Sequence, residues 1–371
     1  KKGPVIEVSP HQLTQKDDKI YLSPNNDGIN DFYSFDLKIK DPSGIQKWDF
    51  TIKDKDNQIV YQKGVEVENF KSQKPRFSAL KNTLQSHNQA FYPTSLVWPC
   101  VDSNGKRLPD GVYTAHITAQ DFKGNQSVLG NSFSTKKEQI LVIDTIPPKV
   151  QVEILYKNFS PNNDGIQDFL LIDHKNVSKE GLWNMEIRTG GSPIFKRSWI
   201  GKPDETIKWD GKNEDNTPLP DGKYEYVLKA TDWAGNQAFY QIDDIYIDTK
   251  TPKVMAKNTD NYFSPNGDNI KDIIEVEQKF NKEGTWAGEI LNQEGKVVKY
   301  FNWQGLPPKT MVWDGKNENQ EVEKDGDYIY KVKGKDKAGN QIEQTLAHFT
   351  IDTTPPKAEV LIPDLYFSPN Q

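Results

Sequence analysis

Hydrophobic and polar residues alternate along much of the chain with a period of two. Residues 224–230 read Tyr-Glu-Tyr-Val-Leu-Lys-Ala, and residues 331–335 continue such a pattern as Lys-Val-Lys-Gly-Lys. Alternation among residues that favour strands predicts β-strands with one buried face. The tripeptides Pro-Asp-Gly at 220–222 and Ala-Gly-Asn at 234–236 are typical of tight turns. The pattern therefore predicts short strands separated by turns.

Three short strings recur along the chain, so the strands belong to repeated units. The first string is Ser-Pro-Asn, followed in the complete copies by x-Asp, and its serines are Ser23, Ser160, Ser264 and Ser368. The second ends in an Asp-x-Ala-Gly-Asn turn, with a looser first copy, and its aspartates are Asp121, Asp232 and Asp336. The third is Ile-Asp-Thr with proline close behind, and it begins at Ile143, Ile247 and Ile351. We interpret the aspartates of the second string as turn caps.

The interval between copies is roughly 100 residues, which is the size of an immunoglobulin-like sandwich. We therefore predict an all-β fold of tandem Ig-like or fibronectin-like β-sandwiches in an elongated rod. Proline fixes φ and removes a hydrogen-bond donor, so the junctions should be short and stiff. The predicted units are 1–147, 148–251 and 252–355, and a truncated fourth unit begins at 356–371.

The first unit is longer than the others, and most of its extra length lies near residues 61–91. This insertion is basic in an acidic chain, contains several aromatic residues and has one helix-like patch at 78–87. It could be a lid on its own sandwich, or a docking face for an acidic or mixed partner. The candidate partner-binding residues are Lys71, Lys74, Arg76, Phe77 and Lys81.

The first string places oxygen-bearing side chains at alternating positions. Their spacing matches part of an EF-hand calcium loop, with Gly28 where that loop turns sharply. Asn269 replaces this glycine in the third copy and tolerates the same left-handed backbone. The alternative is an Asx-turn closed by side-chain to backbone bonds. The candidate calcium ligands are Asn25, Asp27, Asp31, Asn162, Asp164, Asp168, Asn266, Asp268 and Asp272.

Other notable residues indicate structure rather than chemistry. A second acidic loop at 210–221 changes its residue types between copies, which favours a solvated hairpin loop. Trp98, Trp209 and Trp313 recur at one position, which predicts core anchors. Cys100 is the only cysteine and stands in a strand-loop context, which predicts an inert thiol and excludes an intramolecular disulfide.

The sequence lacks the motifs of known catalytic sites. The five histidines share no spacing, and no nucleophile elbow, HExxH motif, P-loop or cysteine cluster occurs. Carboxylates are plentiful but belong to strings that repeat, whereas an enzyme normally has one site. We therefore predict that the chain is not an enzyme.

Composition narrows the remaining classes of partner. Lys and Arg number 47 against 53 Asp and Glu, for a net charge of −6. This balance gives no basic excess to favour nucleic-acid binding. No apolar run approaches the length of a membrane span. Aromatic residues reach 11 %, which predicts small cores built on large rings rather than disorder.

The recurrent strings resemble the bacterial Ig-like repeats. The resemblance rests on Trp-Asp-Gly at 209–211, the stretch from Pro220 to Asn236, and Phe-Ser-Pro-Asn-x-Asp-Gly at 159–165. These repeats are related to the Ig-like domain of the flagellar hook-cap protein and to the C-terminal domain of gliding-motility-associated secreted proteins. The resemblance covers nearly the whole chain and is most specific in the second and third units.

The resemblance implies a β-sandwich in exported bacterial envelope proteins and no single activity. We expect a non-catalytic spacer array, either a scaffold or an adhesin stalk, in the periplasm, on the outer-membrane surface or outside the cell. An envelope or host protein is the expected partner, and calcium the only expected cofactor. The alternatives are a protein- or glycan-recognition module that uses the insertion, and an accessory array of a larger envelope enzyme.

Overall fold

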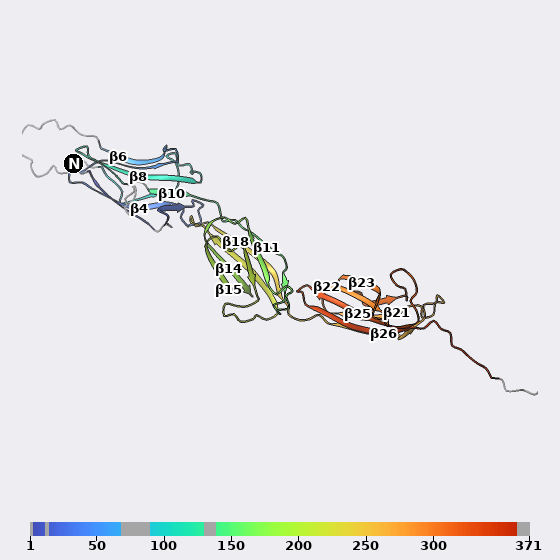
Figure 1. The fold of residues 1–371 in the computed structure, drawn as a ribbon. Helices are drawn as coiled ribbons and strands as arrows, with labels where there is room; N and C mark the ends of the chain where they lie inside the picture. The colour runs from blue at the N-terminus through green and yellow to red at the C-terminus, as the bar shows by residue number, and fades with distance from the viewer. Residues whose placement is uncertain (1–2, 12–14, 68–89, 130–138, 362–371) are drawn as a thin grey trace, which may run out of the picture. The chain divides into compact units, whose positions relative to one another are not determined.

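The computed structural model describes residues 3–11, 15–67, 90–129 and 139–361. Within these ranges the chain forms strands, turns and loops, and no helix is present (Figure 1). The strands pair into three sandwiches, each with a three-stranded sheet and a larger sheet. The predicted all-β class of tandem sandwiches is therefore confirmed.

The first sandwich pairs two antiparallel-rich sheets around one core. Its smaller sheet has the order β1–β4–β7, with bounds Val5–Pro10, Tyr33–Lys40 and Ser95–Trp98. Its larger sheet has the order β2–β3–β10–β8–β5–β6, with bounds Gln15–Lys16, Lys19–Leu22, Gln139–Ile143, Gly111–Asp121, Ile45–Lys53 and Ile59–Glu66. β9 (Gln126–Leu129) also pairs with β8.

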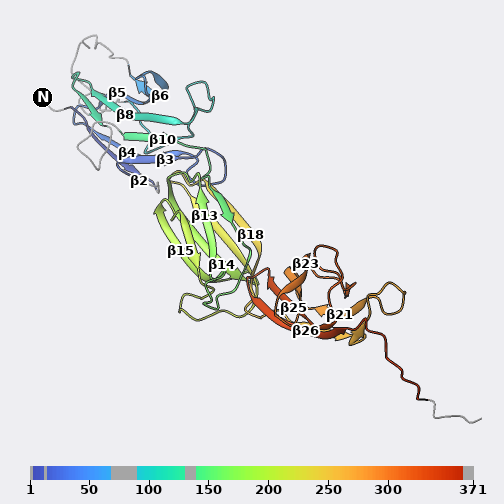
Figure 2. The same ribbon diagram turned by 45° about the vertical axis from the view of Figure 1, so that its right-hand side comes forward.

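The second sandwich repeats this plan with fewer strands (Figure 2). Its smaller sheet is β11–β13–β16, with bounds Gln151–Ile154, Leu170–Lys175 and Thr206–Trp209. Its larger sheet is β12–β18–β17–β14–β15, with bounds Asn158–Phe159, Gln237–Ile247, Gly222–Thr231, Glu180–Thr189 and Ser192–Gly201.

The third sandwich has the same strand order as the second. Its smaller sheet is β19–β21–β24, with bounds Val254–Asn258, Ile274–Phe280 and Thr310–Trp313. Its larger sheet is β20–β26–β25–β22–β23, with bounds Tyr262–Phe263, Gln341–Ile351, Gly326–Asp336, Gly284–Leu291 and Val297–Gly305.

A short strand pairs in parallel with the last strand of each sandwich. These pairs are β3 with β10, β12 with β18, and β20 with β26. The chain then leaves the short strand, crosses to the smaller sheet and enters β4, β13 or β21. The first recurrent string forms this crossing, so the topology fixes it at one end of each sandwich.

Large rings fill the cores, as the composition predicts. Trp98, Trp209 and Trp313 are at most 1 % exposed, which confirms them as core anchors. Each donates its indole N–H at 2.8 Å to the backbone carbonyl three residues later. Burial with a satisfied N–H leaves these rings no role as a ligand platform.

The contacts divide the chain into two compact units. The first contains residues 1–153, 173–205 and 226–242, and the second contains 154–172, 206–225 and 243–371. The predicted boundaries at 147, 251 and 355 stay predictions. The described residues include no helix that is long and apolar enough to span a membrane.

Candidate functional site

The crossing loops have the same closed conformation in all three sandwiches. In the first, Asp31 accepts hydrogen bonds from the backbone amides of Asn26 and Gly28 at 2.6 and 2.8 Å. Asp27 accepts from the amide of Ile29 at 2.7 Å. The corresponding bonds of Asp164 and Asp168, and of Asp268 and Asp272, lie between 2.7 and 2.9 Å.

Left-handed backbone at alternating residues makes this closure possible. In the third loop these residues are Gly267, Asn269 and Lys271, with φ of 83°, 63° and 51°. Asn269 thus adopts the conformation that the sequence required of it in place of glycine. The matching residues of the first loop are Asn26, Gly28 and Asn30, with φ of 66°, 88° and 52°.

The candidate calcium ligands already take part in these hydrogen bonds to the backbone. Each loop brings only two carboxylates together, and both already accept amide hydrogens. No group of three or more His, Cys, Asp or Glu side chains in the described residues could hold a metal ion. The Asx-turn alternative accounts for the observed bonds without an ion. Calcium binding by Asn25, Asp27 and Asp31, and by their counterparts, remains a prediction.

The Ile-Asp-Thr string runs beside the crossing loop in each sandwich. The backbone amide of Asp144 donates to the carbonyl of Leu22 at 2.9 Å, and Asp248 and Asp352 make the same bond to Phe159 and Phe263 at 3.1 Å. The threonine that follows caps the Pro-Asp-Gly loop or its equivalent. For example, Thr249 Oγ1 donates to Asp221 at 2.9 Å. Two recurrent strings therefore share one end of each sandwich.

The second string is a tight turn that its own aspartate caps, as predicted. Asp121 Oδ1 accepts from the backbone amides of Lys123 and Asn125, both at 2.8 Å. Burial acts to raise the pKa of Asp121, but its hydrogen bonds from Asn125 and Lys123 outweigh this and lower it. Asp232 and Asp336 cap their turns with the same bond, at 2.8 and 2.9 Å.

The crossing loop of the first sandwich contacts the turn that follows β17. Both lie in the first compact unit. The buried Ser23 hydroxyl donates to Asn236 Oδ1 at 2.5 Å. Asn236 Nδ2 donates in turn to the backbone carbonyl of Asp144 and to the carboxylate of Asp232, both at 2.8 Å. One carboxamide therefore bonds to the crossing loop, to the segment that follows β10 and to the turn.

Close packing accompanies this contact. Gly235 has φ of +97°, and a Cβ atom there would lie 2.5 Å from Cγ2 of Ile29. The side-chain amide of Asn30 donates at 2.9 Å to the carbonyl of the residue before Gly235. The Lys16 ammonium lies 4.1 Å from the ring centroid of Trp233, which is a cation–π distance.

An equivalent contact lies within the second compact unit. The buried Ser160 hydroxyl donates to Asn340 Oδ1 at 2.7 Å. Asn340 Nδ2 donates to the carbonyl of Asp248 at 2.8 Å and to the carboxylate of Asp336 at 3.0 Å. A Cβ atom on Gly339 would again approach an isoleucine, 2.9 Å from Cγ2 of Ile166. The two copies thus use the same side chains in the same roles.

A half-buried lysine, Lys282, strengthens the second contact. Lys282 donates to Asp248 at 2.7 Å and to Asp336 at 2.9 Å. Burial acts to lower the pKa of Lys282, but these two carboxylates raise it above its ordinary value. The lysine therefore stays charged and holds the turn to the connecting segment.

Sequence reasoning found each string but not the contact between strings. Ser23 and Asn236 are 213 positions apart, and Ser160 and Asn340 are 180 apart. The available signal was the recurrence of both partners, since each contact joins one copy of the first string to a later copy of the second.

The lone cysteine lies in the core. Cys100 is fully buried and has φ of +56°, where the other sandwiches have Gly211 and Gly315 at +71° and +73°. Burial raises the pKa of the Cys100 thiol to about 12. Since the thiolate is the reactive form, this thiol is inert, as predicted.

The predicted insertion is described only at its ends. Tyr61–Glu66 belongs to the edge strand β6, which corresponds to β15 and β23, so the extra length follows Glu66. At the other end the carbonyl of Phe91 accepts from the indole N–H of Trp48 at 2.9 Å. The candidate partner-binding residues, which lie outside the described ranges, are Lys71, Lys74, Arg76, Phe77 and Lys81.

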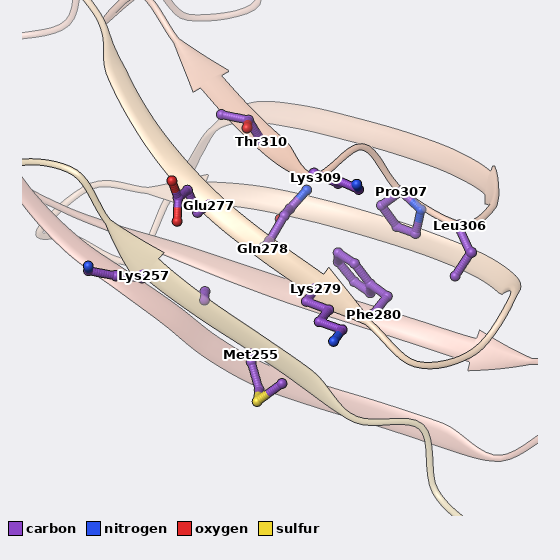
Figure 3. A pocket seen from close by; sticks show the side chains of 11 residues that line it. Met255, Lys257, Glu277, Gln278, Lys279, Phe280, Leu306, Pro307, Lys309 and Thr310 are labelled. Atoms are coloured by element: carbon purple, nitrogen blue, oxygen red, sulfur yellow. The ribbon is translucent and has the colours of Figure 1, made fainter.

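A groove of about 880 Å³ crosses the smaller sheet of the third sandwich (Figure 3). Residues from β19, β21, the loop before β24 and the start of β24 line it, including Met255, Gln278, Phe280 and Leu306. Gln278 is buried and bonded to the Tyr330 hydroxyl at 2.8 Å. The lining also includes charged and hydroxyl side chains, namely Lys257, Glu277, Lys279, Lys309 and Thr310.

One family model matches the chain, over residues 153–242. It is the CHU_C type IX secretion signal domain. The matched segment covers most of the second sandwich and confirms the resemblance to gliding-motility-associated C-terminal domains there. The match indicates an exported protein, as the resemblance implied. No curated protein is significantly similar to the chain.

Several solved structures are distantly similar. The tetra-tandem repeat from the extending region of a large adhesion protein is 15 % identical, covers 95 % of this chain and 75 % of its own, and has a TM-score of 0.31. A structure of a 1.5-MDa bacterial ice-binding adhesin is 10 % identical. The match covers 94 % of this chain and 97 % of the adhesin chain, with a TM-score of 0.32. The fibronectin(III)-like modules of Clostridium thermocellum CbhA are 13 % identical. The match covers 54 % of this chain and 94 % of theirs, with a TM-score of 0.30. Such low scores support no conclusion about function.

Proposed function

We propose that the protein is a non-catalytic spacer array of an exported bacterial protein, serving as a scaffold or an adhesin stalk. In this role the sandwiches hold other parts of the protein at a distance, in the periplasm, on the outer surface or outside the cell. As a stalk it would present a binding segment to an envelope or host protein.

The observation that carries the proposal is the use of the recurrent polar residues. In an enzyme or receptor, polar residues of such motifs would face a substrate or ligand. Here Ser23, Asn236 and Asp232 bond to one another, and Ser160, Asn340 and Asp336 repeat this set. The sequence therefore repeats the parts that join modules, which is what a spacer requires.

Electrostatics of the buried groups agree with a structural role. His174 and Tyr226 form a buried pair, but both ring nitrogens of His174 already have partners at 2.7 Å. Burial raises the pKa of Tyr226 far above its ordinary value, so its hydroxyl stays protonated. Neither group is free to exchange a proton with a substrate.

The proposal is tested by measuring how far the N-terminus of the chain stands from the cell membrane. The full chain, with an epitope tag at its N-terminus, is produced in the bacterium that exports it. A lengthened variant repeats residues 252–355 after Pro355. The expected result is a tag that stands farther from the membrane in the lengthened variant. A Gly-Ser segment of equal length is the control, and it should add less reach because it is a flexible coil. A tag height that does not depend on chain length would overturn the spacer role.

A further inference from the structure

In the first two sandwiches the crossing loop is occupied, because a turn of the next sandwich contacts it. The crossing loop of the third sandwich has no such turn against it within the described residues, and we call it open. This loop runs from Ser264 to Asp272. Ser264 is half-buried, whereas Ser23 and Ser160 are fully buried against an asparagine. Within the described residues no hydrogen bond is made by the Ser264 hydroxyl, while its two counterparts each donate to an Asn Oδ1.

The open loop is already in the conformation of the occupied ones. The Ser264 amide donates to the Lys271 carbonyl at 2.9 Å, and the occupied loops have the same bond at 2.9 Å. Asn266 likewise donates to the Ser264 carbonyl at 2.8 Å, against 2.7 and 2.8 Å. The loop therefore needs no rearrangement to accept a partner, which reduces the entropic cost of binding.

The polar groups of the open loop match a primary carboxamide. In the occupied copies the asparagine oxygen accepts from the loop serine, and its Nδ2 donates to the carbonyl of Asp144 or Asp248. The third sandwich offers Ser264 as donor. It also holds Asp352 at the equivalent place, through its amide bond to Phe263 at 3.1 Å. A hydroxyl donor and a carbonyl acceptor at these two places suit an asparagine side chain.

The apolar part of the contact is also exposed in the third sandwich. Ile270 corresponds to Ile29 and Ile166, which pack on the glycine of the occupied turns. Ile270 is 68 % exposed, whereas Ile29 is 40 % exposed and Ile166 is half-buried. Lys271 corresponds to Asn30 and Gln167, whose side-chain amides donate to carbonyls of the docked turns at 2.9 and 3.0 Å. In the third loop the Lys271 ammonium instead donates to Asp260 at 3.0 Å.

We propose that residues 264–272, with Asp352, form a docking site for the Asp-x-Ala-Gly-Asn turn of a further sandwich module joined through residues 352–355. The asparagine of that turn accepts from Ser264 and donates to the carbonyl of Asp352. The glycine of the turn receives Ile270, because a side chain there would collide with the isoleucine. The turn is thus recognised by a glycine-asparagine pair.

A module that follows in the chain fits this site better than a second copy of the chain. The open turn of the first sandwich has Lys123 where the docked turns have the buried Ala234 and Ala338. In both occupied copies the carbonyl that receives Nδ2 lies on the segment that leads into the docked module. A covalent connection therefore supplies half of the carboxamide site.

Hydrogen exchange of the loop amides tests this assignment. The probe is a four-module chain in which residues 252–355 are repeated after Pro355, so that the added turn is a copy of Asp336–Asn340. We expect the amides of residues 264–272 to exchange about tenfold more slowly than in the original chain. Ser264→Ala should abolish this protection, and the same substitution in the original chain should change nothing.

A second substitution guards against a folding defect of the added module. Replacing the asparagine of the added turn with alanine should remove the protection of residues 264–272 while the added module still melts cooperatively. Equal exchange in the original and four-module chains would overturn the proposal. Protection that instead appears in the original chain as its concentration rises would also overturn it, because the turn would then come from a second copy.

Discussion

Two different side chains make the same pair of hydrogen bonds in the second and third sandwiches. His174 and Gln278 each bond to a carbonyl in the loop before the last strand of the smaller sheet, at 2.7 and 2.9 Å. Each also pairs with a buried tyrosine hydroxyl, Tyr226 at 2.7 Å or Tyr330 at 2.8 Å. The imidazole of His174 therefore replaces the side-chain amide of Gln278 as the partner of a carbonyl and a buried tyrosine hydroxyl.

The partners of His174 fix the position of its proton. A carbonyl can only accept, so Nδ1 must carry the hydrogen in the bond to the Asp204 carbonyl. Nε2 is then the acceptor for the hydroxyl of Tyr226. Burial lowers the pKa of His174, which keeps the ring neutral in the folded protein.

Substitution at this position separates polar pairing from packing. His174→Gln should leave the free energy of unfolding nearly unchanged, because Gln278 already makes these bonds in the third sandwich. His174→Leu should lower it by about 1–3 kcal/mol, since the Tyr226 hydroxyl and the Asp204 carbonyl lose a buried partner. Urea denaturation of the three proteins measures the difference. Equal stability of the Leu and Gln variants would contradict the role assigned to the pair.

The same residue predicts a pH dependence with a defined sign. The pKa of His174 is lower in the folded state than its ordinary value of 6.5, so the unfolded chain takes up the proton first as the pH falls. The stability that neutral His174 supports is therefore present above about pH 6.5 and lost below it. The melting temperature of the wild type should fall more steeply than that of His174→Gln over this range. Parallel pH profiles of the two proteins would refute the assignment.

Residue-scale roles could be predicted where residues recur. The tryptophan anchors repeat at one position, and the lone cysteine replaces a glycine of that alignment, so both roles follow from the sequence. The histidines share no spacing, and so the sequence did not single out His174. The missed signal is that His174–Tyr226 and Gln278–Tyr330 are both separated by 52 positions.

At the scale of elements, each string forms a local turn and also one half of a contact with another string. The local half could be predicted, because Asx-turns and capping aspartates depend on neighbouring residues. The distant half depends on which surfaces the folded sandwiches bring together. No local pattern encodes this, and Ser23 therefore looked like part of a loop rather than the buried donor to Asn236.

Calcium is the open question for these loops. If the loops bind calcium, its addition must raise the melting temperature, by the equivalent of about 2.7 kcal/mol at a hundred times the dissociation constant. Asp164→Asn should then reduce the gain from the loop of the second sandwich. Calorimetry with calcium and with a chelator measures this. Identical melting in both would leave the hydrogen-bonded turn as the whole role of Asp164.

The insertion of the first sandwich allows a second test at this scale. Replacing residues 68–89 with a short Gly-Ser segment keeps β6 and the Trp48–Phe91 bond in place. If the basic insertion binds a partner, this variant should keep its melting temperature and lose proteins that the full chain captures from envelope extracts. Collapse of the first sandwich would instead identify the insertion as a lid, and retention of every partner would exclude a binding role.

At the scale of the whole molecule, the repeated strings and the match to a secretion signal domain describe an exported array of sandwiches. The fold class followed from strand alternation and repetition, because each unit repeats the same pattern of core positions. The elongated rod rests on the stiff proline junctions and remains a prediction. The finer role, as scaffold or stalk, depends on partners that the chain must meet outside itself.

The central claim is that matched serine and asparagine pairs link the crossing loop of one sandwich to the turn of the next. Small-angle scattering of the full chain, compared with Asn236→Ala/Asn340→Ala, tests it most directly. We predict for the wild type a maximum dimension several times that of one sandwich and a narrow distribution of shapes. The double variant should keep folded modules but show a broader distribution. A compact wild-type profile, or a profile that the two substitutions leave unchanged, would contradict the account.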